Sequence, residues 1–176
     1  MLLRYAHANH LNDFDWFLKC DDDSYIIMEN LRLTLSQYSP DDPWLMGRRF
    51  KPFTPQGYMS GGAGYVLSRK AVDKLVTEAM RTPKVCKIND DTGAEDAEMG
   101  KCLYGVGVKI ADSRDEEGRQ RFFPFTPESH LTENYCKSYL FNFCQRVFHL
   151  SLLTIRFWSL DLAIRLLPLA TWPSLL

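Results

Sequence analysis

With 176 residues, the chain is long enough to form one domain around a single hydrophobic core. It carries 21 basic and 22 acidic residues, for a formal net charge of −1, and shows no Lys/Arg-rich stripe. This balance gives no long-range attraction to nucleic acid, so we expect no nucleic-acid partner.

Short apolar runs alternate with segments of helical periodicity through the first 137 residues. These patterns, the turn around residues 40–43 and a helix N-cap at Ser68 together predict a regular series of elements. They are strands at 14–20, 44–46, 65–67 and 106–110, and helices at 27–38, from Ser68 toward Met80, and from Ala94 or Glu95 onward. Such alternation is typical of an α/β sandwich.

Composition divides the chain near Lys137, and we predict a domain at 1–137 and a divergent apolar tail at 138–176. All ten glycines precede residue 138, whereas the tail holds eleven leucines. Arg156, Asp161 and Arg165 interrupt the tail, so it lacks the roughly 20 apolar residues of a membrane span. Polar residues at near-helical spacing predict a helix with a narrow polar stripe, and an interfacial helix and an unpacked tail both stay open.

Three consecutive carboxylates, Asp21, Asp22 and Asp23, directly follow the first apolar strand. Adjacent carboxylates repel one another and are tolerated only in water or beside a cation. Divalent ions such as Mn²⁺ or Mg²⁺ prefer carboxylate and phosphate oxygens. In an extended chain Asp21 and Asp23 would point to one face and hold the metal, while Asp22 faces the other way. The alternative is a solvated acidic turn between a strand and a helix.

A glycine-rich segment, YMSGGAGY at 58–65, leads into a predicted strand. Its spacing is neither that of a dinucleotide fingerprint nor that of a phosphate-binding P-loop. Glycines there would let the backbone approach a flat ligand such as a sugar ring, with the tyrosines as stacking faces. The alternative is a tight turn that needs positive φ angles.

Glu95 and Asp96 stand at the start of a predicted helix. The helix dipole favours carboxylates in a first turn whatever their function, so a purely structural role stays open. In the functional interpretation, one carboxylate takes a proton from an acceptor hydroxyl while a metal holds a leaving diphosphate.

Taken together, these blocks resemble the core 1 β1,3-galactosyltransferases and, more broadly, the Fringe-related β1,3-glycosyltransferases. The resemblance covers roughly residues 12–135 and is carried by WFLKCDDDSY (16–25), GRRFKP (47–52), QGYMSGGAGYVLS (56–68), ED (95–96) and DSRD (112–115). It implies an incomplete GT-A fold, a Rossmann-like α/β/α sandwich, that uses UDP-galactose and Mn²⁺. The acceptor would be GalNAc on Ser or Thr of a glycoprotein, and the product Galβ1-3GalNAc, formed with inversion.

The resemblance also implies residue roles. Asp21 and Asp23 would bind the metal, and Lys19, Asp21 and Asp22 the donor. Asp96 would be the general base, with Glu95 beside it as a second catalytic residue that orients the acceptor. The sugar pocket would include Tyr58, Gly61, Gly62 and Glu95.

The resemblance further implies a disulfide between Cys86 and Cys102. Members of the family are single-pass type II proteins of the Golgi membrane with a luminal catalytic domain, although no anchor or signal is visible in this chain. A homodimer is a further expectation.

The chain also departs from the family pattern. Asp21 comes only twenty residues after the start, so we expect a truncated N-terminus without most of the uracil-binding wall. Phe123 and Ser129 stand where the family has histidines, and the tail does not resemble the segment that completes the metal site. We therefore expect the chain as given to transfer little or no galactose. The alternative function is that of a non-catalytic relative, either a chaperone-like or interaction protein or a barely functional product.

Overall fold

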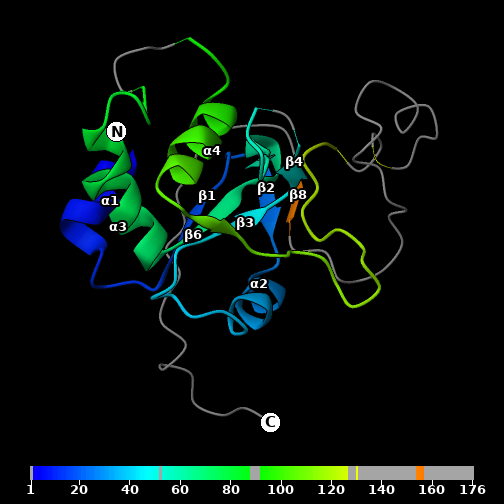
Figure 1. Ribbon diagram of the computed structural model, residues 1–176. Helices are drawn as coiled ribbons and strands as arrows, with labels where there is room; N and C mark the ends of the chain where they lie inside the picture. The colour runs from blue at the N-terminus through cyan, green and yellow to red at the C-terminus, as the bar shows by residue number, and fades with distance from the viewer. Residues whose placement is uncertain (1, 52, 88–91, 127–129, 131–153, 157–176) are drawn as a thin grey trace.

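A computed structural model describes residues 2–51, 53–87, 92–126, 130 and 154–156 as a mixed α/β fold (Figure 1). The α-helices are α1 (Leu2–His10), α2 (Met28–Leu35), α3 (Arg69–Thr77) and α4 (Glu95–Gly105), and two short 3₁₀ helices are η1 (Gly61–Ala63) and η2 (Ala79–Arg81). The strands are β1 (Trp16–Lys19), β2 (Ser24–Ile26), β3 (Trp44–Gly47), β4 (Arg49–Phe50), β5 (Tyr58–Met59), β6 (Tyr65–Ser68), β7 (Lys109–Ile110) and β8 (Thr154–Arg156).

The central sheet has the strand order β1-β6-β3-β7. Strand β6 is antiparallel to both β1 and β3, while β3 and β7 are parallel, so β1, β3 and β7 all run in the same direction. Their carboxyl ends therefore lie at one edge, which we call the carboxyl edge; it comprises residues 20–23, 48–51 and 111–114, together with residues 60–64 before β6. In open α/β sheets this is the edge at which ligands bind.

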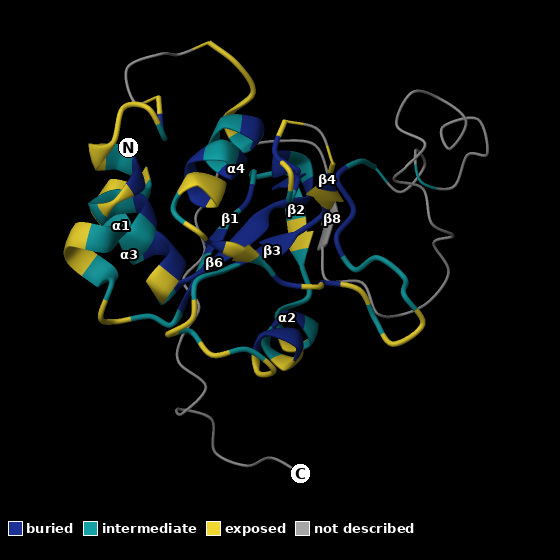
Figure 2. Ribbon diagram, in the orientation of Figure 1, coloured by how far each residue is buried: buried dark blue, intermediate teal, exposed yellow. Residues whose placement is uncertain are grey.

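Helices cover both faces of the sheet, because residues along each strand alternate between two hydrophobic clusters (Figures 1 and 2). On β1, Trp16 and Leu18 pack with Leu31 of α2, whereas Phe17 packs with the cluster that contains Leu75 of α3. The predicted α/β sandwich is thus confirmed at the level of its class and layers.

Local signals placed the starts of α2, α3 and α4 correctly, whereas α1 was not predicted. Ser68 ends β6 and caps α3, since its Oγ accepts a hydrogen bond from the Ala71 N–H at 3.1 Å. The same Oγ donates to the carbonyl of Asp42 and accepts from the Trp44 N–H, at 2.6 and 2.9 Å. The cap therefore also ties β6 to the chain that enters β3.

Two predicted conformations need correction. Asp22 and Asp23 lie in a turn, closed by a 3.1 Å hydrogen bond from the Ser24 N–H to the Asp21 carbonyl, so the extended chain with alternating faces is wrong. The predicted strand at 106–110 is reduced to β7, because Val106 caps α4 and Gly107 has a φ of 72°.

The prediction of a helical tail is wrong for the three tail residues that the structure describes. Thr154–Arg156 form β8, which pairs antiparallel with β2. The β-branched Thr154 and Ile155 favour strand over helix, and the non-local pairing with Ser24–Ile26 was not visible in the sequence. The rest of the tail, the predicted boundary at 137 and Ser129 lie outside the described residues.

Among the described residues, no helix is long and apolar enough to cross a lipid bilayer.

Candidate active site

The glycine-rich segment brings its backbone against the end of β1. Gly64 has a φ of 69°, and a Cβ there would lie only 2.9 Å from the Lys19 carbonyl oxygen. A glycine is therefore required, and the tight-turn interpretation holds at this position. The close approach brings Gly61 near the same lysine, since a Cβ on Gly61 would lie 3.6 Å from Lys19 Nζ. Gly62 is the partly exposed member of this turn.

Lys19 links the aspartate run to the start of α4. Its Nζ lies 3.1 Å from Asp21 Oδ1 and 3.5 Å from Glu95 Oε2. Burial lowers the pKa of Lys19, but Glu95 and Asp21 outweigh burial and raise that pKa above the ordinary value of lysine. The lysine is therefore a fixed cation between two carboxylates.

The buried Tyr65 forms a hydrogen bond with Glu95. Its hydroxyl donates a 2.6 Å hydrogen bond to Glu95 Oε1, and its ring lies 5.8 Å from Lys19 Nζ. Burial and the Glu95 carboxylate raise the pKa of Tyr65 well above its ordinary value, so the phenol stays a donor.

Asp96 lies against the glycine turn. Its Oδ2 accepts from the Gly61 N–H at 2.9 Å, and its Oδ1 accepts from the Ala97 N–H at 2.8 Å. These two backbone donors fix the orientation of the carboxylate, while each oxygen keeps a second lone pair for a proton. Asp96 is partly exposed and could meet a substrate hydroxyl.

Helix α4 owes its position to a close contact and a covalent link. A Cβ on Gly100 would fall 2.3 Å from Tyr58 Cβ, so only glycine lets the helix pack this tightly on β5. Cys86 and Cys102 form a disulfide, the pair that the family resemblance implied, with Cα atoms 4.7 Å apart. Both constraints fix the helix whose first turn carries Glu95 and Asp96.

The expectation that the tyrosines offer stacking faces to a sugar is wrong for Tyr65. Its side chain is 1% exposed and its hydroxyl is bound to Glu95. Tyr58 is 8% exposed and contacts the rings of Phe50 and Phe53 at 5.7 and 5.6 Å between centroids. Burial, followed by the charge of Asp96, raises the pKa of Tyr58 above its ordinary value. A role for Tyr58 in acceptor binding stays a prediction.

Two carboxylates of the aspartate turn could contribute to a divalent metal site. Asp21 and Asp23, both partly exposed, offer the hard carboxylate oxygens that Mn²⁺ prefers, within one turn. Among the described residues no group of three or more His, Cys, Asp or Glu side chains could hold a metal ion. Asp21 and Asp23 alone therefore do not make up a complete ligand set within the described residues.

Sequence reasoning missed the links between these residues. It placed Lys19 with the donor and Glu95 with the acceptor, but did not foresee that one ammonium group touches both Asp21 and Glu95. It also did not foresee Tyr65 as the support of Glu95. No local pattern carries these contacts, because β1, β6 and α4 meet only in the folded chain.

Comparison with known proteins gives three informative relatives. The chain is 53% identical to glycoprotein-N-acetylgalactosamine 3-beta-galactosyltransferase 1 of Xenopus laevis over 134 residues, and the matched region covers 76% of this chain. It is 33% identical over 116 residues to a beta-1,3-glucosyltransferase of Mus musculus, covering 64% of this chain. It is 26% identical over 145 residues to chondroitin sulfate synthase 3 of Mus musculus, covering 77%.

The chain spans 36%, 22% and 15% of the lengths of these three relatives. The family model described as Fringe-like matches residues 1–116, which include the aspartate turn, the glycine turn and the Glu95-Asp96 pair. The chain belongs to the Fringe-like family.

Proposed function

We propose that this chain carries the catalytic edge of an inverting β1,3-galactosyltransferase. It would transfer galactose from UDP-galactose to GalNAc on Ser or Thr of glycoproteins and form Galβ1-3GalNAc. The observation that carries the proposal is the contact of Lys19 with both Asp21 and Glu95, at 3.1 and 3.5 Å, which joins a donor-side carboxylate to an acceptor-side one. The 53% identity to the Xenopus galactosyltransferase supports the choice of sugars.

On the donor side, Asp21 and Asp23 would hold Mn²⁺. The metal, when bound, would neutralise the charge that develops on the leaving diphosphate. Lys19 adds a second positive charge close to Asp21, and Asp22 would contact the donor sugar from the same turn. Two carboxylates and one ammonium group together suit a metal–diphosphate complex.

On the acceptor side, Asp96 would act as general base. As the acceptor oxygen forms its bond to the anomeric carbon of galactose, the bond to UDP breaks on the opposite face, and the hydroxyl proton passes to Asp96. Glu95, held by Tyr65, would orient the acceptor hydroxyls. Tyr58, Gly61 and Gly62 would complete the sugar pocket around Asp96.

The same proposal includes the finer fold and the location. We expect the complete protein to adopt the GT-A variant of the α/β class and to act in the lumen of the Golgi as a type II membrane protein. An oxidising lumen would maintain the Cys86–Cys102 disulfide.

A chimera tests the proposed function without depending on the termini of this chain. The 134 matching residues would replace their counterparts in the Xenopus galactosyltransferase, which supplies everything else. We expect Mn²⁺-dependent transfer of radiolabelled galactose to a GalNAc-Thr peptide, with a β1,3 linkage by NMR. The matched chimera with Asp96→Asn controls for background activity of the host.

Three results would contradict the proposal. Preferential transfer from UDP-glucose would reassign the donor, as the similarity to glucosyltransferases allows. A different linkage would reassign the acceptor hydroxyl. A folded chimera that binds UDP but transfers nothing would favour the non-catalytic alternative.

A further inference from the structure

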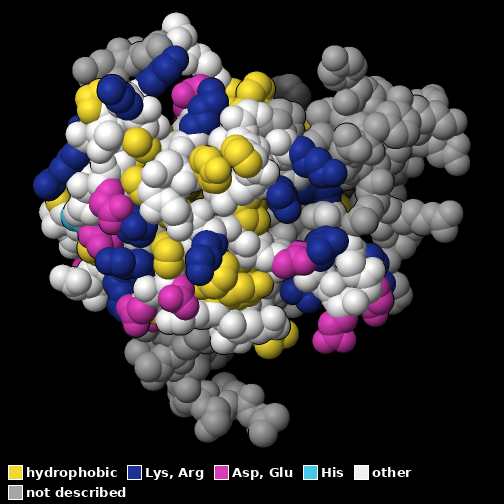
Figure 3. Space-filling view, in the orientation of Figure 1, with side chains coloured by type: hydrophobic (Ala, Val, Ile, Leu, Met, Phe, Trp, Pro, Cys, Tyr) yellow, Lys and Arg dark blue, Asp and Glu magenta, His cyan; other side chains and the backbone are white. Residues whose placement is uncertain are grey.

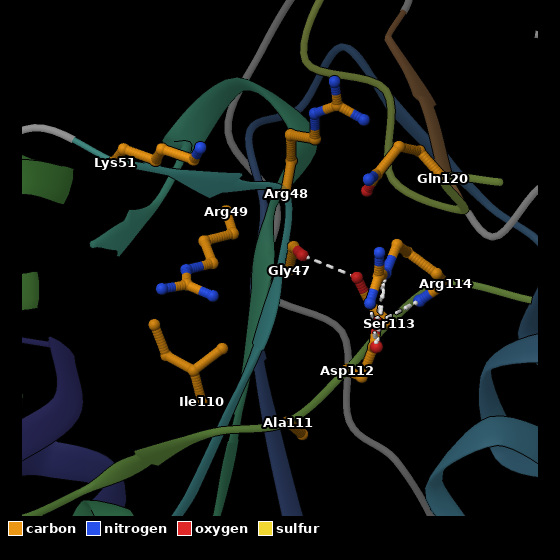
Figure 4. A pocket seen from close by; sticks show the side chains of 10 residues that line it. All are labelled: Gly47, Arg48, Arg49, Lys51, Ile110, Ala111, Asp112, Ser113, Arg114 and Gln120. Atoms are coloured by element: carbon orange, nitrogen blue, oxygen red, sulfur yellow. Dashed lines mark hydrogen bonds and ion pairs between the residues drawn. The ribbon is translucent and has the colours of Figure 1, made fainter. Parts of the chain in front are cut away.

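A basic pocket lies on the carboxyl edge, at the ends of β3 and β7 (Figure 4). The cavity has a volume of about 350 Å³ and is lined by four cationic side chains and one carboxylate: Arg48, Arg49, Lys51, Arg114 and Asp112. In the space-filling view, Lys and Arg side chains gather on the face near β4 (Figure 3). None of these residues has a role in the proposed chemistry.

Three of the cations differ from Arg48 in their contacts or exposure. Arg114 forms an ion pair with Asp112, with 2.6 Å between Nη2 and Oδ2. Arg49 donates from Nε to the Gln56 carbonyl at 2.7 Å, and both Arg49 and Lys51 are exposed to water. Solvent or a protein partner therefore stabilises each of these charges.

Arg48 is the exception. It is 6% exposed, and within the described part of the chain its guanidinium forms no hydrogen bond or ion pair. No dashed line reaches it in Figure 4, where it lies on the same side of the pocket as the amide of Gln120. Burial lowers its pKa to about 10. The nearby His130 cannot supply the opposite charge, since an imidazole is either neutral or cationic; burial and the charge of Arg48 lower the pKa of His130 to about 4.

A buried charge without a counter-ion is costly, and proteins keep one where a ligand supplies the opposite charge. A guanidinium donates several N–H bonds in one plane, which matches the two oxygens of a carboxylate or the face of a phosphate. The cationic lining thus selects an oxyanion.

The strand order places the pocket on the acceptor side of the site. Asp21 to Asp23 follow β1, the Asp96 carboxylate binds the turn before β6, and the pocket lies beyond, at β3 and β7. The Ser60 N–H donates to the Arg48 carbonyl at 2.9 Å, and the next residue, Gly61, donates to Asp96. Arg48 is therefore connected to the proposed base, Asp96, through the backbone hydrogen bonds of Ser60 and Gly61. It lies on the side of Asp96 that faces away from the aspartate turn.

We propose that the Arg48 pocket binds an acidic group of the acceptor, a carboxylate or phosphate near the GalNAc, and so gives the protein a preference for acidic glycopeptides. The assignment of this acidic group to the acceptor rests on the proposed function. The binding of an oxyanion rests on the pocket alone.

The test compares Arg48→Met with the parent 176-residue chain by calorimetry, using three probes. They are a GalNAc-Thr peptide flanked by Glu, the same peptide flanked by Gln, and UDP with Mn²⁺. We expect the parent to bind the Glu peptide more tightly and Arg48→Met to reduce that affinity roughly 10- to 100-fold, to the level of the Gln peptide. UDP affinity should not change, so a failure of this inference is distinguishable from a failure of the donor site. Arg81→Met, an exposed arginine in η2, is the matched control.

Thermal unfolding without ligand supplies an independent readout. Because methionine removes a buried charge that has no counter-ion among the described residues, Arg48→Met should raise the melting temperature as it weakens acidic-peptide binding. A lower melting temperature with unchanged peptide affinity would show a structural arginine and overturn the proposal. A loss of UDP affinity instead would assign the oxyanion to the donor and overturn the acceptor assignment. Equal affinity of the parent for Glu and Gln peptides would also overturn the acceptor assignment.

Arg48→Lys keeps the charge without the planar donors and should retain intermediate affinity for the Glu peptide. This variant keeps the proposal testable if the methionine variant does not fold.

Discussion

The two flanks of the carboxyl edge differ in how their charges are matched. On the β1 flank, Lys19 lies between the carboxylates of Asp21 and Glu95, and Tyr65 supplies a further hydrogen bond. On the β3 and β7 flank, the buried Arg48 has no such partner among the described residues. The charges of the first flank are paired within the described residues, whereas we propose that a ligand supplies the counter-charge of the second.

This difference separates two tasks. A reaction centre gains from groups that are already oriented, because little reorganisation is then needed during the chemical step. A selective subsite gains from a charge that only the right ligand satisfies, since the wrong ligand leaves it buried and unpaired. A substitution on one flank should therefore leave ligand binding on the other flank unchanged.

The largest effect should follow the loss of the proposed base. In the chimera, Asp96→Asn keeps the shape of the side chain and one oxygen that can accept from Gly61 or Ala97, but it cannot take a proton, so turnover should fall by roughly 10²–10⁴-fold. UDP affinity should stay the same. Steady-state kinetics against Glu98→Gln, on the same helix, provides the comparison. Near-normal turnover in Asp96→Asn would move the role to another carboxylate.

Gly100→Ala should disturb the β1 flank through the backbone. The added Cβ would lie 2.3 Å from Tyr58 Cβ, so α4 must shift away from β5. Overpacking of this kind costs about 1–3 kcal/mol of unfolding free energy, which urea denaturation measures. Lys101→Ala, an alanine substitution at a partly buried site of the same helix, should cost much less. Equal stability of Gly100→Ala and the parent would show that the contact is not tight.

Tyr65→Phe should have a smaller effect. It removes the 2.6 Å hydrogen bond to Glu95, but Glu95 is 56% exposed on its side chain and water can replace the hydroxyl. We expect a loss of about 1 kcal/mol of stability, together with a weaker acceptor affinity in the chimera. Binding of the GalNAc-Thr peptide at full parental strength would argue against Glu95 as the orienting residue.

The smallest effect concerns pH and the basic flank. Burial and Arg48 lower the pKa of His130 to about 4, below its ordinary value, so the unfolded chain binds the proton more readily than the folded one. His130 should therefore reduce stability as the pH falls from about 6.5 toward 4. Melting temperatures across this range should fall more for the parent than for His130→Phe. If the melting temperatures of the two proteins fall equally across this pH range, the lowered pKa of His130 is refuted.

The sequence predicted what depends on short-range signals. The alternation of strands and helices, the cap at Ser68 and the start of α4 at Glu95 all follow from patterns within a few residues. By contrast, β2 pairs with β8 and β4 pairs with β5 in ladders of two or three residues. Strands this short leave no periodicity to detect, and their existence depends on a distant partner.

The candidate site divides in the same way. The residues themselves were visible as motifs, and the structure places Gly61, Glu95 and Asp96 together. The turn at Asp22 and Asp23, the bridge through Lys19 and the burial of Arg48 were not visible, because each depends on contacts between separate elements. Helix α1 was missed too, since it is held mainly by packing on α3 through apolar residues such as Leu3.

Calorimetry with UDP tests most directly whether the β1 flank, with Asp21 and Asp23, is a metal–diphosphate site. The parent chain should bind UDP weakly and only with Mn²⁺, and Asp23→Ala should lower that affinity by more than about 10-fold, since it removes a direct ligand. Glu78→Ala, which removes an exposed carboxylate beyond the end of α3, should bind as the parent does. Equal Mn²⁺–UDP affinity for the parent and Asp23→Ala would contradict the account.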